Sequence, residues 1–138
     1  MRKSRGSTLV ESAIVLLMFV VILLGVMDFA QILFFHHVLS ERVRSSVRYA
    51  VVHPYDATAI QNFVAYDSPT VPPGGVGLFG LSPSMVQVNR YEAGTADDRV
   101  RVTISTYRMR FLSPWLAGTF TPGPFSAVMP LESGGAAN

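Results

Sequence analysis

The chain has 138 residues, 49% of them hydrophobic, and its formal net charge is +2. This length suits one modest domain with an additional element, and the small net charge gives no reason to expect nucleic acid as a partner. Cysteine is absent, which excludes disulfide frameworks and thiolate metal sites. Because the hydrophobic excess lies mostly in the first third of the chain, a membrane segment ahead of a more polar domain is expected.

The N-terminal segment combines a basic head with a long apolar run. Arg2, Lys3 and Arg5 form the head. Glu11 stands in the first turns of the run, residues 12–27 are uncharged, and apolar residues continue beyond Asp28 to Phe35. A helix over residues 12–35 is roughly 36 Å long at about 1.5 Å per residue. It is long enough to cross a hydrocarbon core of about 30 Å.

Three interpretations of this segment compete. A cleaved secretory signal has an apolar core of about 7–15 residues and a small-residue cleavage site; this run is longer, and no such site follows closely. A signal anchor fits the length, with the basic head kept in the cytoplasm, although arginines also flank the far end of the run. Neither interpretation explains Glu11, because a carboxylate is unfavourable in lipid.

The third interpretation rests on Gly6-Ser7-Thr8-Leu9-Val10-Glu11, which resembles the processing site of the type IV pilin superfamily. The resemblance implies that an inner-membrane prepilin peptidase cuts between Gly6 and Ser7, so that Glu11 becomes the fifth residue of the mature chain. Cleavage creates an α-amino group at Ser7 that is largely protonated at neutral pH. Since an unpaired carboxylate buried among helices is costly, this amine on a neighbouring subunit is a suitable partner for Glu11 in a filament. The alternative is a carboxylate that snorkels at the membrane surface.

Two further stretches narrow the resemblance. Gly25-Val26-Met27-Asp28-Phe29 and Val43-Arg44-Ser45-Ser46-Val47-Arg48-Tyr49-Ala50 look like the acidic–aromatic and arginine-rich motifs of the TadE-like family. These proteins are pseudopilins, or minor pilins, of tight-adherence (Tad, Flp) pili. The resemblance is strong over residues 1–50, and the residues beyond them argue against the much shorter major pilin. Asp28 is interpreted as an assembly contact, with an accidental position at the membrane interface as the alternative.

The remaining sequence predicts a small head. Pro54 ends the first helix near His53. Val43, Val47 and Ala50 fall on one side of this helix, and Arg44 and Arg48 form an i, i+4 pair on another. A second helix is expected over residues 58–66, with Thr58 as N-cap. Alternating residues predict strands at 85–91 and 99–107 that form a hairpin, and an edge strand at 125–131. The fold class is therefore α+β: a long N-terminal transmembrane and stalk helix, then a small head with an antiparallel sheet. The expected divisions are 1–6 (leader), 7–53 (helix) and 54–138 (head).

No motif supports an enzyme, a cofactor or a metal site. Residues 75–80 satisfy G-x-G-x-x-G, but they follow Pro-Pro and open no helix, so the context of a nucleotide site is missing. His36 and His37 are adjacent on a helix and lack companion ligands. Asp97-Asp98 is expected to be a solvated turn. Trp115 and Phe120 are expected to pack in the core or, alternatively, to form an adhesive patch.

The sequence thus predicts a single-pass inner-membrane prepilin, with its N-terminus cytoplasmic and its head periplasmic, that joins the extracellular pilus after maturation. The resemblance implies the prepilin peptidase, other Tad pilins and pseudopilins, and platform proteins as partners, and surface attachment and secretion as roles. The alternatives are a signal-anchored periplasmic binding or sensing module that does not polymerise, and a secreted hydrolase.

Overall fold

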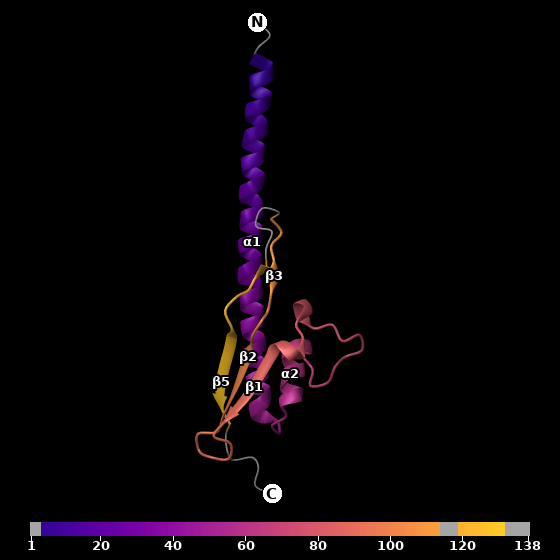
Figure 1. Cartoon of the computed structure of the whole chain (residues 1–138), viewed down its shortest axis with the longest axis vertical. Helices are drawn as coiled ribbons and strands as arrows, with labels where there is room; N and C mark the ends of the chain where they lie inside the picture. Colours follow the sequence, from indigo (N-terminus) through magenta and orange to yellow (C-terminus); the bar gives the residue numbers. More distant parts are fainter. Residues whose placement is uncertain (1–3, 114–118, 132–138) are drawn as a thin grey trace. The chain divides into compact units, whose positions relative to one another are not determined.

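The computed structural model describes residues 4–113 and 119–131. Its helices are α1 (Ser4–Val52) and α2 (Ala57–Tyr66), with short 3-10 turns η1 (Leu78–Gly80) and η2 (Pro83–Met85). Its strands are β1 (Val86–Tyr91), β2 (Arg99–Ile104), β3 (Met109–Arg110), β4 (Thr119–Phe120) and β5 (Phe125–Pro130). A long N-terminal helix followed by a small antiparallel sheet confirms the predicted α+β class (Figure 1).

The chain divides into two compact units, and α1 contributes to both. Unit 1 comprises residues 1–35 and 110–120, and unit 2 comprises residues 36–109 and 121–138. The three-stranded sheet lies wholly in unit 2, whereas Asp28 and the 110–113 segment lie in unit 1.

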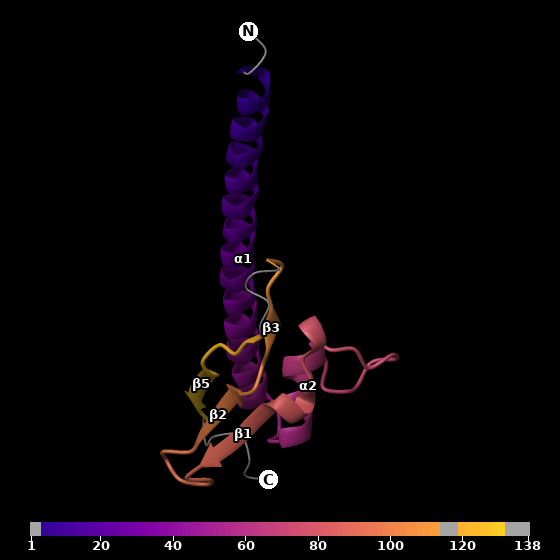
Figure 2. The ribbon, with the colours of Figure 1, turned by 45° about the horizontal axis from the view of Figure 1, so that its top comes forward.

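Unit 2 is built on an antiparallel sheet in the order β1-β2-β5, whose strands run side by side in Figure 2. Val88 pairs with Val102, and Val102 pairs with Ala127, so β2 is the central strand. Alternate residues of β2 are buried, as the predicted half-buried pattern requires. The helices add further side chains to this core. The buried apolar residues of unit 2 include Leu39, Val43, Val47, Ala50, Ile60, Val64, Ala65, Leu81, Val86, Val100, Val102, Ile104, Tyr107, Met109 and Phe125.

The faces predicted for the end of α1 are confirmed. Val43, Val47 and Ala50 are buried, while Arg44 and Arg48 are exposed. The burial follows from the 3.6-residue period, which places positions 43, 47 and 50 on one stripe of the helix. This stripe belongs to unit 2 and ties the C-terminal part of α1 to the sheet domain.

The structure differs from the expectation in several local details. The N-cap of α2 is Asp56 rather than Thr58, because the Asp56 carboxylate accepts hydrogen bonds from the amides of Thr58 and Ala59. Strand β2 ends at Ile104 rather than at 107, and Thr106 nearby has a positive φ of 69° that a strand does not tolerate. The two-residue strands β3 and β4 pair with each other and were not predicted.

Candidate processing and assembly site on the N-terminal helix

Gly6 and Ser7, the predicted cleavage pair, lie in the first turns of α1, which begins at Ser4. A methyl group added to Gly6 would meet no heavy atom within 4 Å. Glycine inside a helix costs about 0.5–1 kcal/mol relative to alanine. Within the described structure, packing therefore gives no reason for a glycine at this position. Cleavage at Gly6 and the boundaries 1–6, 7–53 and 54–138 remain predictions.

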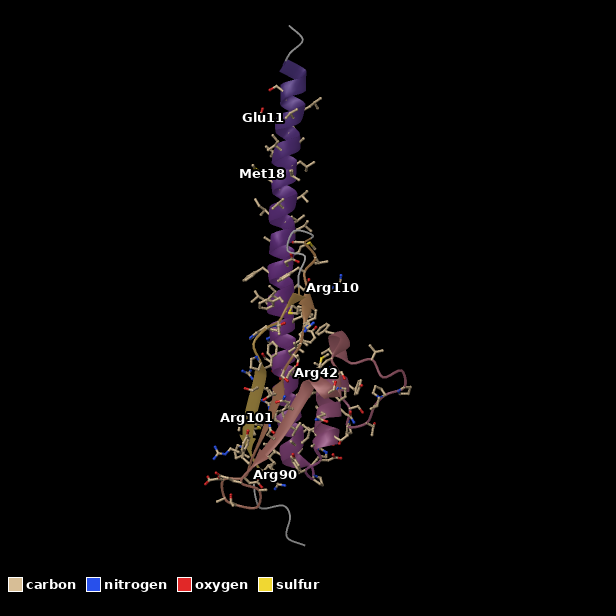
Figure 3. The ribbon with its side chains drawn as sticks, viewed as in Figure 1. Glu11, Met18, Arg42, Arg90, Arg101 and Arg110 are labelled. Carbon is tan, nitrogen blue, oxygen red and sulfur yellow. The ribbon has the colours of Figure 1, made fainter. Side chains whose placement is uncertain are left out.

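Glu11, labelled in Figure 3, is an exposed side chain of α1 and lies on a surface that is otherwise apolar. Its neighbours Leu9, Val10 and Ile14 are all exposed, with 73% of Leu9 accessible. No ion pair within residues 4–113 and 119–131 includes Glu11. The carboxylate is thus a single charge on a surface that is otherwise suited to lipid or to other helices.

The apolar surface of α1 extends well beyond Glu11. Between Gly6 and Val52, α1 contains an 18-residue window apolar enough to cross a membrane, and none of that window is buried inside the protein. Large side chains from Leu9 to Phe34 are exposed along it. An uncovered helix that is apolar on all sides needs a membrane or other helices around it. This helix is a candidate membrane span.

Asp28, the second predicted contact, is buried in unit 1, only 3% exposed. Its carboxylate accepts hydrogen bonds from the backbone amides of Leu112 (2.7 Å) and Ser113 (3.2 Å), and from the Ser113 hydroxyl. One turn further along, Gln31 Nε2 donates to the carbonyl of Arg110 at 3.4 Å. Asp28 is thus held by its own chain, while its role as a contact between subunits remains a prediction.

Sequence reasoning did not identify these partners of Asp28. They lie more than eighty positions away, and residues 110–113 carry no charged partner for a carboxylate other than Arg110. The structure does not bring Asp28 and Glu11 together.

Asp98 was expected to be solvated, and this expectation is wrong. It is 2% exposed and accepts three hydrogen bonds from the Arg90 guanidinium, with Nε at 3.0 Å from Oδ1. The amide of Gly94 donates to the same carboxylate at 2.9 Å. These bonds, with the Arg90 hydrogen bonds first, lower the pKa of Asp98 to about 2, and Asp98 in turn raises the pKa of Arg90. The pair therefore closes the β1–β2 hairpin and is a structural feature.

The glycine motif at residues 75–80 is explained by the backbone. Gly75 and Gly80 have φ values of 55° and 75°, which glycine adopts without strain. A Cβ atom at Gly77 would lie 1.9 Å from the carbonyl oxygen of Leu81 and 3.2 Å from that of Ala65. Only glycine fits at Gly77. The three glycines thus shape the connection between α2 and β1.

The two histidines have separate surroundings in unit 2. The His36 ring packs edge-on against Phe125, with centroids 5.2 Å apart. His37 lines a surface pocket of about 370 Å³ beside an ion pair between Arg42 and Asp67. Among the residues that the structure describes, no group of three or more acidic, histidine or cysteine side chains is arranged to hold a metal ion.

Of the two aromatics singled out for packing or adhesion, Trp115 lies outside the described residues. Phe120 is 40% exposed, and its ring centroid lies 6.1 Å from that of Phe111.

Comparison with known protein families bears on the first third of the chain. The family described as TadE-like protein matches residues 6–48. Residues 6–48 are a TadE-like region. The match confirms the resemblance predicted from the motifs, and it contains Gly6, Ser7, Glu11 and Asp28. No curated protein and no solved structure matches the chain.

The TadE-like region begins at Gly6 and ends at Arg48, so it coincides with most of α1. TadE-like proteins are a structural family of minor pilins associated with the Tad pilus, and they are not known as enzymes. Within the region the side chains up to Phe34 are mostly exposed, whereas Leu39, Val43 and Val47 are buried in unit 2. The TadE-like region therefore combines a candidate membrane span with a packing face for the sheet domain.

Proposed function

We propose that this chain is a minor pilin of a Tad/Flp-type type IV pilus. A prepilin peptidase cuts it between Gly6 and Ser7, α1 holds it in the inner membrane, and the mature chain then enters the pilus. The observation that carries the proposal is the exposed Glu11 on an otherwise apolar and uncovered helix in the TadE-like region.

The exposed surface of α1 suits two environments in succession. Before assembly, lipid covers the apolar side chains, and Glu11 lies near the cytoplasmic interface, where a charge costs little. In a filament, helices of neighbouring subunits cover the same side chains. There Glu11 is removed from water and requires a partner. Membrane residence and polymerisation thus use the same surface of α1, but only polymerisation requires a partner for the Glu11 carboxylate.

The partner that cleavage supplies is the α-amino group of Ser7 on a neighbouring subunit. It is largely protonated at neutral pH, and its pairing with Glu11 fixes the axial register of one helix against the next. Gly6, which has no neighbour within reach of a side chain, fits a residue kept for peptidase recognition. A non-polymerising anchor requires neither residue.

The proposal also implies how the chain is oriented in the membrane and which proteins it binds. Arg2, Lys3 and Arg5 stay in the cytoplasm by the positive-inside rule, so the sheet domain faces the periplasm and, after assembly, the cell exterior. The partners are the peptidase, other Tad pilins and pseudopilins, and the platform proteins that extract subunits from the membrane. Surface adhesion is the function served by the assembled pilus.

The pairing is tested with Glu11→Gln, which removes the charge and keeps the size of the side chain. We expect near-normal membrane insertion and cleavage, because an interfacial charge is not required for residence in the bilayer. Breaking a buried ion pair costs about 3–5 kcal/mol, which corresponds to a loss of more than about a hundredfold in an association constant. The measurement is the amount of tagged protein in sheared pili relative to the membrane fraction.

Glu41→Gln is the matched control, since Glu41 is an exposed carboxylate on the same helix. It should partition into pili as the unmodified chain does. An unchanged partition of a correctly cleaved Glu11→Gln protein would contradict the pairing and leave Glu11 as a recognition or snorkelling residue.

A further inference from the structure

Asp28 and Gln31 bind the backbone of residues 110–113, a segment that begins at the end of β3 and continues as irregular chain beside an apolar helix. We propose that this segment is a second membrane contact, which lies at the outer boundary of the bilayer and is held there by Asp28. The inference rests on the membrane residence of α1 that belongs to the proposed function. Asp28 and Gln31 lie within the TadE-like region, whereas residues 110–113 lie beyond it.

Polar groups of this backbone segment have partners within the protein. Irregular backbone is excluded from lipid unless its N–H and C=O groups find partners within the protein. The amides of Leu112 and Ser113 both donate to Asp28, and the carbonyl of Arg110 accepts from Gln31. Two polar side chains one turn apart on α1 thus replace the water that this segment would otherwise bind.

The same contacts account for a carboxylate inside an apolar run. Asp28 is buried, and its carboxylate accepts hydrogen bonds from three donors of its own chain. It therefore does not face lipid as an unpaired charge. A carboxylate that accepts several hydrogen bonds is far less costly in a dry environment than an unpaired one. Asp28 and the 110–113 segment therefore satisfy each other at membrane depth.

The distance along α1 sets the depth of Asp28 in the bilayer. If the hydrocarbon core begins at Ser12, Asp28 lies about 24 Å further along the helix axis at about 1.5 Å per residue. A core of about 30 Å then ends just beyond Asp28. Leu112 and Ser113 are fixed to Asp28 by hydrogen bonds and so lie at the same level, where acyl chains give way to headgroups.

Unit 1 presents exposed apolar side chains at this level. Leu112 is 60% exposed and Phe120 is 40% exposed, beside a helix on which Phe29 and Leu33 are also exposed. Arg110, labelled in Figure 3, is also exposed, and a long basic side chain can reach the phosphate headgroups from this depth. Apolar side chains flanked by an arginine match a lipid interface, and the apolar surface continues that of the candidate span.

The test exploits the absence of cysteine in the chain. A nitroxide spin label is placed at Leu112→Cys in the full-length protein, which is reconstituted alone at low density in phosphatidylcholine–phosphatidylglycerol vesicles. Collision of the label with oxygen, which concentrates in the bilayer, is compared with collision with a water-soluble nickel chelate. Leu17→Cys is the reference for lipid, and Val76→Cys, on an exposed loop of unit 2, is the reference for water.

We expect the label at position 112 to be several times less accessible to nickel than the label at 76. Adding Asp28→Ala should raise the nickel accessibility of the 112 label towards that of position 76, because the segment loses its acceptor. Asp28→Asn, which keeps one acceptor oxygen, should lie between the two.

A label at 112 as accessible to nickel as that at 76, with position 17 protected, would overturn this inference and leave the membrane helix intact. Protection at 112 only after incorporation into pili would assign the segment to a contact between subunits instead. If Asp28→Ala left the label at 112 as protected from nickel as before, Asp28 would not be the residue that holds the segment at the membrane. A nickel-accessible label at position 17 would contradict the membrane span itself, and with it the proposed function.

Discussion

Asp98 shows how one buried carboxylate organises a hairpin. It binds Arg90 of β1 and the amide of Gly94 in the connecting loop, and its own amide and carbonyl take part in backbone hydrogen bonds to Thr95 and Leu131. Side chain and backbone of one residue therefore join both ends of the β1–β2 connection to the chain after β5. Loss of the Asp98 charge should therefore weaken both the β1–β2 connection and its attachment to the chain after β5.

The pKa of Asp98 predicts how the stability of unit 2 depends on pH. Because folding lowers this pKa from 3.8 to about 2, the stabilising contribution is fully present above about pH 4 and is lost as the pH falls towards 2. Asp98→Asn should lower the free energy of unfolding at pH 7 and flatten its decline between pH 4 and pH 2. Urea unfolding of the full chain in detergent micelles measures both effects.

The control for this change is Asp97→Asn, the exposed neighbour. It should keep the unmodified chain's stability at pH 7 and its decline below pH 4. Equal loss of stability for the two variants at pH 7 would show that the Arg90–Asp98 pair does not stabilise the hairpin.

The two aspartates also show what could not be predicted from the sequence at this scale. Asp97 and Asp98 sit in the same polar loop, and no pattern separates them. Burial of Asp98 depends on Arg90, which comes within reach only when β1 and β2 pair in their particular register, Tyr91 opposite Arg99. Local polarity predicts a turn, whereas a buried ion pair requires the tertiary arrangement.

At the scale of elements, the connection from α2 to β1 depends on Gly77. A side chain there would collide with backbone oxygens of Leu81 and Ala65, neither of which is the flexible end of a side chain. Gly77→Ala should therefore lower the free energy of unfolding by about 1–3 kcal/mol, the usual cost of overpacking. Urea unfolding of the full chain in micelles measures this loss.

Gly123→Ala is the matched control, because an added methyl group there meets nothing within 4 Å and the residue has no positive φ. It should change stability by no more than about 0.5 kcal/mol. A Gly77→Ala protein as stable as Gly123→Ala would mean that the connection rearranges at little cost.

Elements with a clear period were predictable, and those set by tertiary contacts were not. The buried stripe at Val43, Val47 and Ala50 and the alternation in β2 follow from the helix and strand periods. Asp56 and Thr58 are both good N-cap residues, so composition did not distinguish them, and the extended φ of Asp56 decides in its favour. The short strands β3 and β4 are too brief for any pattern.

At the scale of the whole molecule, the TadE-like region carries most of what was predictable about function. Gly6, Glu11 and the apolar run are contiguous in sequence, so a resemblance can find them without a fold. The Asp28–Ser113 contact joins positions 85 apart, and nothing in the local sequence of either indicates the other. The roles proposed for Gly6 and Glu11 are argued from their chemistry, and the membrane contact proposed for residues 110–113 is argued from their hydrogen bonds to Asp28.

The central claim is that the chain is a cleaved subunit that enters a pilus, and the N-terminus of the assembled protein tests it most directly. Pili sheared from cells that express the tagged chain should contain it, and mass spectrometry of its N-terminal peptide should show a first residue of Ser7. Gly6→Ala removes the proposed cleavage residue and is the reference for the N-terminus of a chain that lacks it. A chain found only in the membrane fraction, with Met1 or Arg2 still at its N-terminus in piliated cells, would contradict the account and favour a signal-anchored module that does not polymerise.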